Sequence, residues 1–131
     1  MATIIAPDSL APARGYSNGL LFERGRILFV SGQVGWDREK RFVSNELVGQ
    51  FAQSLDNVLA VVREAGGAPE HIGRLTVYVT DKRLYNANVK AIGAAYRERM
   101  GKHYPAMALV EVKALLEDEA LCEIEATAVV P

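Results

Sequence analysis

Two carboxylates lie on alternate positions near the C-terminus, in the stretch "CEIEATAVV" that begins at Cys122. Side chains two residues apart in a β-strand point to the same face, so Glu123 and Glu125 would lie side by side. Such a pair is able to serve as general acid and general base. A solvated strand face explains the same residues equally well, and the sequence leaves both interpretations open.

The other reactive side chains are few. Cys122 alternates with the apolar residues Ile124 and Ala126, which predicts a buried thiol instead of a nucleophile. His71, in "PEHIG", and His103, before "YPAM", have no carboxylate or cysteine at the spacing of a catalytic triad or a metal site. We expect both histidines at the surface. The chain also has no phosphate-binding glycine loop and no nucleophile elbow, and because no cluster of Cys and His has metal-ligand spacing we expect no metal.

The composition argues against several classes of protein. Lys and Arg total 15 against 16 Asp and Glu, a net charge of -1, so the basic character that favours nucleic acid is missing. No apolar run is long enough to span a membrane, and the N-terminus lacks the basic start and apolar core of a signal sequence. A single cysteine forms no internal disulfide, which favours a cytoplasmic location. We expect residues 1–131 to form a single domain.

Two helices are expected to position the candidate residues. From about Asn45 the apolar residues recur at helical spacing, with Ser44 or Asn45 as the N-cap and Gly66 and Gly67 as the end. A second helix is expected to start after Asp81 and to stop at Gly101. Its apolar face would comprise Tyr85, Val89, Ile92 and Tyr96.

The remaining segments predict a β-sheet. Residues 1–18, rich in Pro, Ala and Ser, are expected to form an irregular arm, and "GLLFERGRILFVSGQV" predicts a β-hairpin with Gly25 in its turn. Further strands are expected at residues 74–80, 104–112 and 120–130. The order β-β-α-β-α-β-β favours an α+β fold, a mixed sheet with both helices on one face. The other face would be bare, which predicts a homo-oligomer.

The stretch "YPAMALVEVKALL" has two different faces. One is uniformly apolar, whereas Met107 and Leu109 share the other face with Glu111 and Lys113. The alternation by itself does not decide whether Met107 is core or lines a pocket.

These segments, in this order, resemble the Rid family of imine and enamine deaminases, which also carries the older label of L-PSP endoribonucleases. The resemblance covers nearly the whole chain, through "GYSNGL", "ILFVSGQVG", "QFAQSLDNVLAVVREAGG", "RLTVYVTD", "YPAMALVEV" and "CEIEATAVV". It implies a chorismate-mutase-like fold, a homotrimer and ligand pockets in the clefts between subunits. It also implies hydrolysis of an imine to a carbonyl compound and ammonia without a cofactor.

The resemblance also implies roles for particular residues. Tyr16 matches the family's site tyrosine, Gly32 the glycine at the pocket floor, Asn88 a helix asparagine, and Glu123 the glutamate that holds the water. The family's carboxylate-binding arginine directly follows the Pro-Ala pair, and that position here is Met107. If the resemblance holds, Met107 lines the pocket where a charged anchor would stand.

Three further residues complete the candidate site. Arg14 is the cation best placed to compensate for the missing arginine, although a solvated arginine in an arm is the simpler interpretation. Trp36 would stack on a ligand or cover the edge of the core, and the sequence favours neither. Leu109 would line the pocket beside Met107.

Three functions follow, in order. The first is a Rid-like hydrolase of an imine or enamine that is not a simple 2-imino acid. The second is a trimer that binds a small metabolite without turnover. The third is an endoribonuclease or translation inhibitor, which ranks last because no basic groove or histidine pair supports RNA cleavage.

Overall fold

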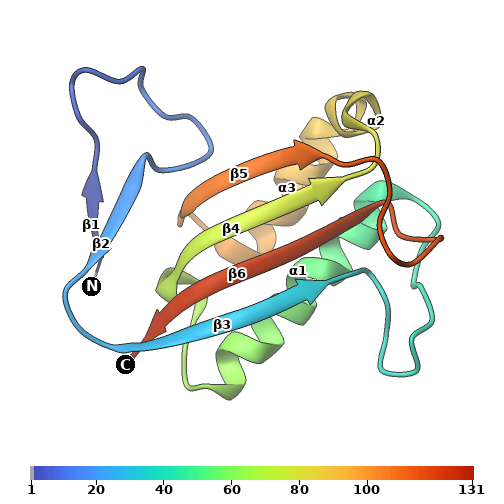
Figure 1. The fold of residues 1–131 in the computed structure, drawn as a ribbon, viewed down its shortest axis with the longest axis horizontal. Coiled ribbons are helices and arrows are strands. Elements are labelled where there is room, and N and C mark those ends of the chain that lie inside the picture. The colour runs from blue at the N-terminus through green and yellow to red at the C-terminus, as the bar shows by residue number, and fades with distance from the viewer. Residues whose placement is uncertain (1) are drawn as a thin grey trace.

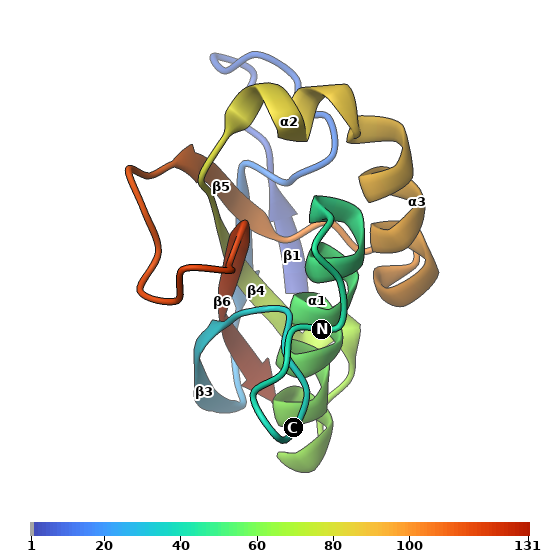
Figure 2. The same ribbon diagram turned by 90° about the vertical axis from the view of Figure 1, so that its right-hand side faces the viewer.

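The computed structural model describes residues 2–131 and shows a four-stranded sheet with its helices on one side (Figures 1 and 2). The strand order is β3-β6-β4-β5. β6 (Cys122–Val130) is antiparallel to β3 (Arg26–Gln33) and to β4 (Ile72–Val79), whereas β5 (Ala106–Glu111) is parallel to β4. The sheet is therefore mixed, as expected.

The helices α1 (Leu47–Glu64) and α3 (Val89–Met100) pack on the same face of this sheet. Their apolar stripes meet every second side chain of β4 and β6, because strand side chains alternate between the two faces. The buried core includes Leu55, Val58, Leu59 and Val62 of α1, Leu75 and Val77 of β4, Ile92 of α3, and Ile124 and Ala128 of β6. The opposite face of the sheet is open and carries exposed Ile27 and Phe29.

The expected ends of α1 are partly confirmed. The N-cap is Glu46, one residue after the expected pair, and Ser44 instead accepts a hydrogen bond from the Glu46 amide at 3.0 Å. At the other end Gly66 adopts φ +87°, and the Gly67 amide donates to the Val62 carbonyl at 2.9 Å. This is a glycine-terminated helix end, as the sequence indicated.

The second expected helix is two helices. Asp81 caps α2 (Lys82–Ala87) by accepting from the amides of Arg83 and Leu84, and α3 begins after a break at Asn88. Asn88 donates from its side chain to the Leu84 carbonyl at 2.8 Å. The break turns the helix axis, so Val89 is exposed, and its expected place on the apolar face is wrong.

The N-terminal segment differs most from expectation. The expected irregular arm contains a strand, β1 (Ala2–Ile5), which pairs antiparallel with β2 (Gly19–Phe22) in a separate two-stranded sheet. The expected hairpin between β2 and β3 is wrong, because β3 pairs with β6 alone. Gly25, expected in its turn, has φ +132° and packs so tightly on Val129 and Val130 that any Cβ there would overlap them.

One buried side chain connects the loops at the end of the sheet where β6 starts. Gln50 of α1 is fully buried and donates to the carbonyls of Ser44 at 3.1 Å and Glu119 at 2.9 Å. Its Oε1 accepts from the Leu121 amide at 2.8 Å. A single amide thus fixes the entry into α1 and the entry into β6, and Glu123 lies two residues further along β6.

We expect Gln50→Ala to lower the free energy of unfolding by roughly 3 kcal/mol, because it leaves buried backbone groups without partners. The measurement is urea unfolding followed by circular dichroism. Gln53→Ala is the matched control, since Gln53 lies one position before Ser54 on the same helix and donates only to the Asn57 side chain. Equal losses for the two variants would contradict the bridging role.

Candidate functional site

Glu123 and Gly32 lie together on the open face of the sheet. β3 has an irregularity between Val30 and Gln33, so residues 31 and 32 fall out of the ladder with β6. This places the Glu123 carboxylate directly over the Gly32 backbone, where a Cβ on residue 32 would overlap Oε2 and lie 2.8 Å from Cδ. The absence of a side chain at Gly32 makes room for the carboxylate.

The second carboxylate on this face is already engaged. The Tyr78 hydroxyl of β4 donates to Glu125 Oε2 at 3.0 Å. That hydrogen bond, together with desolvation and the charges of Glu125 and Glu123, raises the pKa of Tyr78, so its hydroxyl remains a donor at neutral pH. Glu125 is thereby held by a phenol, whereas Glu123 meets the bare backbone of Gly32.

The thiol beside Glu123 faces the other way, as predicted. Cys122 is completely buried under α1, and its Sγ lies 3.8 Å from Ser54 Oγ. Burial raises the pKa of the Cys122 thiol to about 11, which leaves almost no thiolate at neutral pH. The only cysteine of the chain is therefore a buried core residue and not a nucleophile.

Met107 and Leu109 lie on the helix-covered side of edge strand β5. Met107 is opposite Leu75 and Leu109 is opposite Val77, both of which are core residues of β4. Both side chains are half-buried and pack against the core. Because Glu123 occupies the open face, one chain does not bring it together with Met107.

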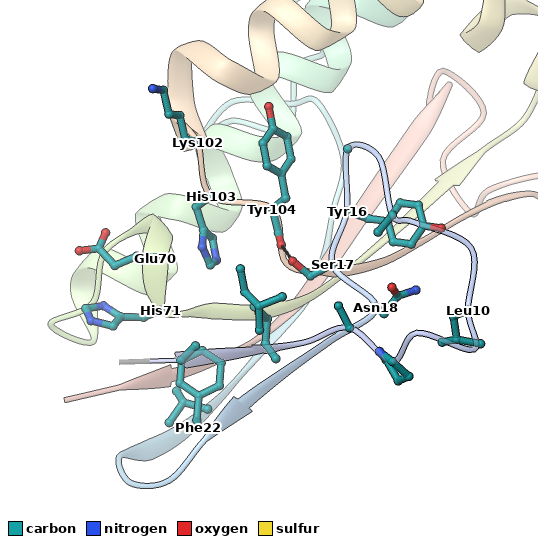
Figure 3. Close-up of a pocket in the computed structure, with 18 of the residues that line it drawn as sticks. Leu10, Tyr16, Ser17, Asn18, Phe22, Glu70, His71, Lys102, His103 and Tyr104 are labelled. Carbon is teal, nitrogen blue, oxygen red and sulfur yellow. Dashed lines mark hydrogen bonds between the residues drawn. The ribbon is translucent and has the colours of Figure 1, made fainter.

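Tyr16 lies in a different place again, on the loop between β1 and β2. This loop is fixed to the start of β5 by Ser17, whose amide donates to the Pro105 carbonyl at 3.1 Å and whose hydroxyl donates to the Tyr104 carbonyl. Strands β1 and β2 with the loop between them form the N-terminal hairpin. Tyr16 is 40% exposed and lines a cleft of about 1200 Å³ between this hairpin and the end of the four-stranded sheet. Figure 3 shows Tyr16 and Leu10 at one end of this cleft and His71 at the other.

The two histidines are not free at the surface, which corrects the expectation. Both are half-buried and line the cleft: His103 Nε2 lies 2.7 Å from the Ile72 carbonyl, and His71 Nδ1 accepts from the Ala68 amide at 2.8 Å. His71 precedes β4 and His103 precedes β5. Because parallel neighbouring strands start at the same end of a sheet, both histidines reach the same cleft. The pairing of β4 with β5 predicts this shared position, whereas the residues around each histidine do not.

The remaining candidates lie apart from these groups. Arg14 is exposed, and its neighbours Ala13 and Gly15 line the cleft while Arg14 itself does not. Trp36 follows β3, packs on Phe42 with ring centroids 5.7 Å apart, and has Lys40 Nζ 5.4 Å from its ring. Asn88, at the helix break, is half-buried. The structure thus joins Glu123 with Gly32 and keeps the other candidates separate within one chain.

Two kinds of feature are absent from residues 2–131. No group of three or more His, Cys, Asp or Glu side chains in this part of the chain is arranged to hold a metal ion. None of the helices described here has the length and apolar character needed to cross a membrane.

Comparison with known proteins identifies the family. The sequence model described as Endoribonuclease L-PSP matches residues 6–130. A "2-iminobutanoate/2-iminopropanoate deaminase" of Salmonella typhimurium is 35% identical over 129 residues, covering 98% of this chain and 95% of the relative. The RutC family protein PM1466 of Pasteurella multocida is 35% identical over 130 residues, covering 98% of each chain. The chain belongs to the endoribonuclease L-PSP family, which is also called the Rid or YjgF family.

Solved structures agree with this assignment. The Rid family protein YyfB of Yersinia pestis matches with a TM-score of 0.88 and 33% identity, over 98% of both chains. The YjgF gene product of Escherichia coli matches with a TM-score of 0.68 and 33% identity, over 98% of this chain and 95% of that one. The resemblance to the Rid family and the chorismate-mutase-like α+β fold are confirmed.

We expect Gly32→Ala to displace the Glu123 carboxylate while changing the free energy of unfolding by less than about 1 kcal/mol, since the atoms in conflict end a flexible side chain. A crystal structure of the variant and urea unfolding measure the two effects. In the control Gly93→Ala on α3, the new Cβ meets only the Arg97 guanidinium, at 3.2 Å. An unmoved carboxylate in Gly32→Ala, with β3 shifted instead, would contradict the expectation.

Proposed function

We propose that the protein is a Rid-like hydrolase that converts a reactive imine or enamine to a carbonyl compound and ammonia. The observation that carries this proposal is the Glu123 carboxylate, seated over the backbone of Gly32 on an open sheet face. The relatives named as 2-iminobutanoate/2-iminopropanoate deaminases, at 35% identity, support the reaction class.

The chemistry requires one base and no metal. Water adds to the imine carbon while a proton passes to the nitrogen, and the resulting carbinolamine collapses to a carbonyl compound and ammonia. Glu123 would orient the water, accept its proton as the oxygen adds to carbon, and pass that proton to the nitrogen to give the neutral carbinolamine. It would then accept the hydroxyl proton of the carbinolamine and deliver it to the nitrogen as the C–N bond breaks and ammonia leaves. A carboxylate suits this role because it accepts hydrogen bonds from water without holding it covalently.

The complete site would be formed between copies of the chain. Glu123 and Gly32 lie on the open face, whereas Met107 and Leu109 lie on the other side of the sheet. The loop that carries Tyr16 is attached at the start of β5. A cleft between neighbouring subunits would bring the two groups together. We propose a homotrimer, and the exposure of Ile27 at 67% and Phe29 at 79% supports a covered sheet face.

The substrate would not be a simple 2-imino acid. An arginine binds a carboxylate through two charge-assisted hydrogen bonds, each worth roughly 1.5 to 3 kcal/mol, and the thioether of Met107 provides neither. A pocket wall made of Met107, Leu109 and Tyr16 suits a larger, less acidic or aromatic imine. Asn88 and Trp36 remain proposed contacts for the distal part of such a ligand.

Arg14 is the proposed substitute if a carboxylate is bound after all. It is exposed two residues before Tyr16, within reach of a ligand beside that ring. Arg14→Ala would then weaken binding of a carboxylate ligand and leave the oligomer unchanged, because the side chain takes no part in the core.

A second candidate is a trimer that binds a small metabolite in the same pocket without turnover. The loss of the arginine favours it, because an altered pocket can retain its shape and lose its reaction. Under this alternative Glu123 would affect ligand selectivity alone. An endoribonuclease is the distant third, and RNA affinity that does not depend on salt would remove it.

Imines are generated in place by an amino-acid oxidase from acidic, aliphatic and aromatic amino acids. We expect wild-type protein to give enzyme-dependent release of ammonia, above the spontaneous rate, from at least one of the larger aromatic imines and little from the small aliphatic or acidic ones. Glu123→Gln should abolish that release, because an amide accepts no proton from water at neutral pH. Glu125→Gln is the matched control on the same strand and should retain activity. Loss of activity in both variants, or in neither, would count against Glu123 as the base.

We expect Met107→Arg to lower KM for 2-imino acids by at least about tenfold, which corresponds to ~1.4 kcal/mol and is less than one charge-assisted hydrogen bond supplies. Steady-state kinetics on aliphatic 2-imino acids measure the effect. Met107→Leu is the control, since it keeps an apolar side chain of similar volume and should leave KM unchanged. An arginine variant no better than the leucine variant would place residue 107 outside the pocket.

A further inference from the structure

In the part of the chain that the structure describes, the four-stranded sheet leaves the outer edge of β3 unpaired, and the two-stranded sheet of β1 and β2 leaves the outer edge of β2 unpaired. Within residues 2–131, β3 pairs with β6 only and β2 pairs with β1 only. The edge of β3 runs over eight residues and carries Ile27 and Phe29, which are 67% and 79% exposed. On the hairpin, Leu21 is 50% exposed. Long unpaired edges with apolar side chains invite pairing with another strand.

The sequence specifies how these two edges would pair. In "GLLFERGRILFV" an antiparallel arrangement about Arg24 and Gly25 sets Phe22 opposite Ile27 and Leu20 opposite Phe29. Both of these pairs are apolar, and the next pair inward, toward Arg24 and Gly25, brings Glu23 opposite Arg26. The two edges therefore match in polarity and charge.

One chain is unable to form this pairing while Ser17 keeps its hydrogen bonds. Ser17 is bonded to Pro105 and Tyr104 at the start of β5, which is the edge of the sheet opposite β3. A strand added outside β3 would lie four strand spacings from β5, about 19 Å. Gly19, the first residue of β2, follows Ser17 by only two residues and reaches no further than about 7 Å from it.

We propose that β2 of one copy pairs antiparallel with β3 of a second copy, so that the N-terminal hairpin is exchanged between subunits. Both sets of interactions are then satisfied together: Ser17 stays on its own β5, and the edge of β3 is covered by a neighbour. Each copy donates one hairpin and accepts one, so the exchange closes into a ring and is compatible with a trimer. The loop of Tyr16 then stays attached to β5 of its own chain, the strand that carries Met107.

This proposal does not depend on the reaction proposed above. It concerns the assembly, and a protein that binds a metabolite without turnover would exchange its hairpin in the same way. Exchange of the hairpin would also explain why the sequence has the pattern of a β2–β3 hairpin although one chain does not form it.

The test uses cysteine pairs placed on different chains. Leu20→Cys and Phe29→Cys variants of distinguishable mass are mixed in denaturant, refolded together and oxidised. We expect a disulfide between the two different chains, detected by non-reducing electrophoresis and mass spectrometry. Because opposing pairs in antiparallel strands alternate between wide and narrow separations, Leu21→Cys with Leu28→Cys provides the second spacing. The native Cys122 does not compete, since it is fully buried with its pKa raised to about 11.

The matched control mixes Leu21→Cys with Phe29→Cys. These positions would fall on opposite faces of the joined sheet, so no cross-link is expected. A single chain that carries both cysteines of a pair distinguishes exchange between copies from pairing within one copy. Covalent dimers and trimers support exchange, whereas an internal disulfide at the mass of one chain would show that the hairpin folds onto its own β3. Absence of any cross-link at both spacings would equally overturn the proposal.

Discussion

Strand β6 is the element on which the rest of the structure depends, because it is paired along both edges and buried along one face. Its side chains alternate without exception between buried and half-buried positions from Cys122 to Val130. α1 covers the buried set, and the half-buried set forms the middle of the open face. The direction of Glu123 is thus a consequence of core packing, since a strand that buries Cys122 and Ile124 has to turn Glu123 outward.

The division between the two sides of the sheet explains the arrangement of the candidate residues. Groups suited to handling water lie on the open face, where the irregularity in β3 admits a carboxylate over Gly32. Groups suited to recognising a substrate lie along edge strand β5 and the loop bonded to it. Neither set is a pocket by itself. The proposed function therefore requires an assembly in which two copies of the chain each contribute one set.

The sequence was sufficient wherever local periodicity determines the outcome. The stripe of α1, the alternation around Cys122 and the stop at Gly101 all follow from spacing and from glycine chemistry, and all are confirmed. The family motifs assigned Glu123 and Gly32 to the same pocket, and the structure places the two in contact. Their roles stay predictions.

The differences arise where distant parts of the chain decide. The break at Asn88 depends on a hydrogen bond back to Leu84, and it removes Val89 from the apolar face. The placement of both His71 and His103 along one cleft depends on the parallel pairing of β4 with β5. The hairpin of β2 with β3 had the correct local pattern, but Ser17 holds the preceding loop at the far edge of the sheet. That hydrogen bond joins residues far apart in the sequence, so no short stretch of sequence predicts it.

The attachment of Ser17 to β5 has an evolutionary consequence. It ties the loop of Tyr16 to the strand of Met107, so the parts proposed to recognise a ligand are inherited as one mechanical unit. The carboxylate proposed to act on water lies on another strand and another face. Substitutions along β5 would therefore change the range of ligands without disturbing the proposed reaction. Methionine at position 107, which we propose takes the place of an arginine, would be a change of this kind and would leave Glu123 and Gly32 as they are.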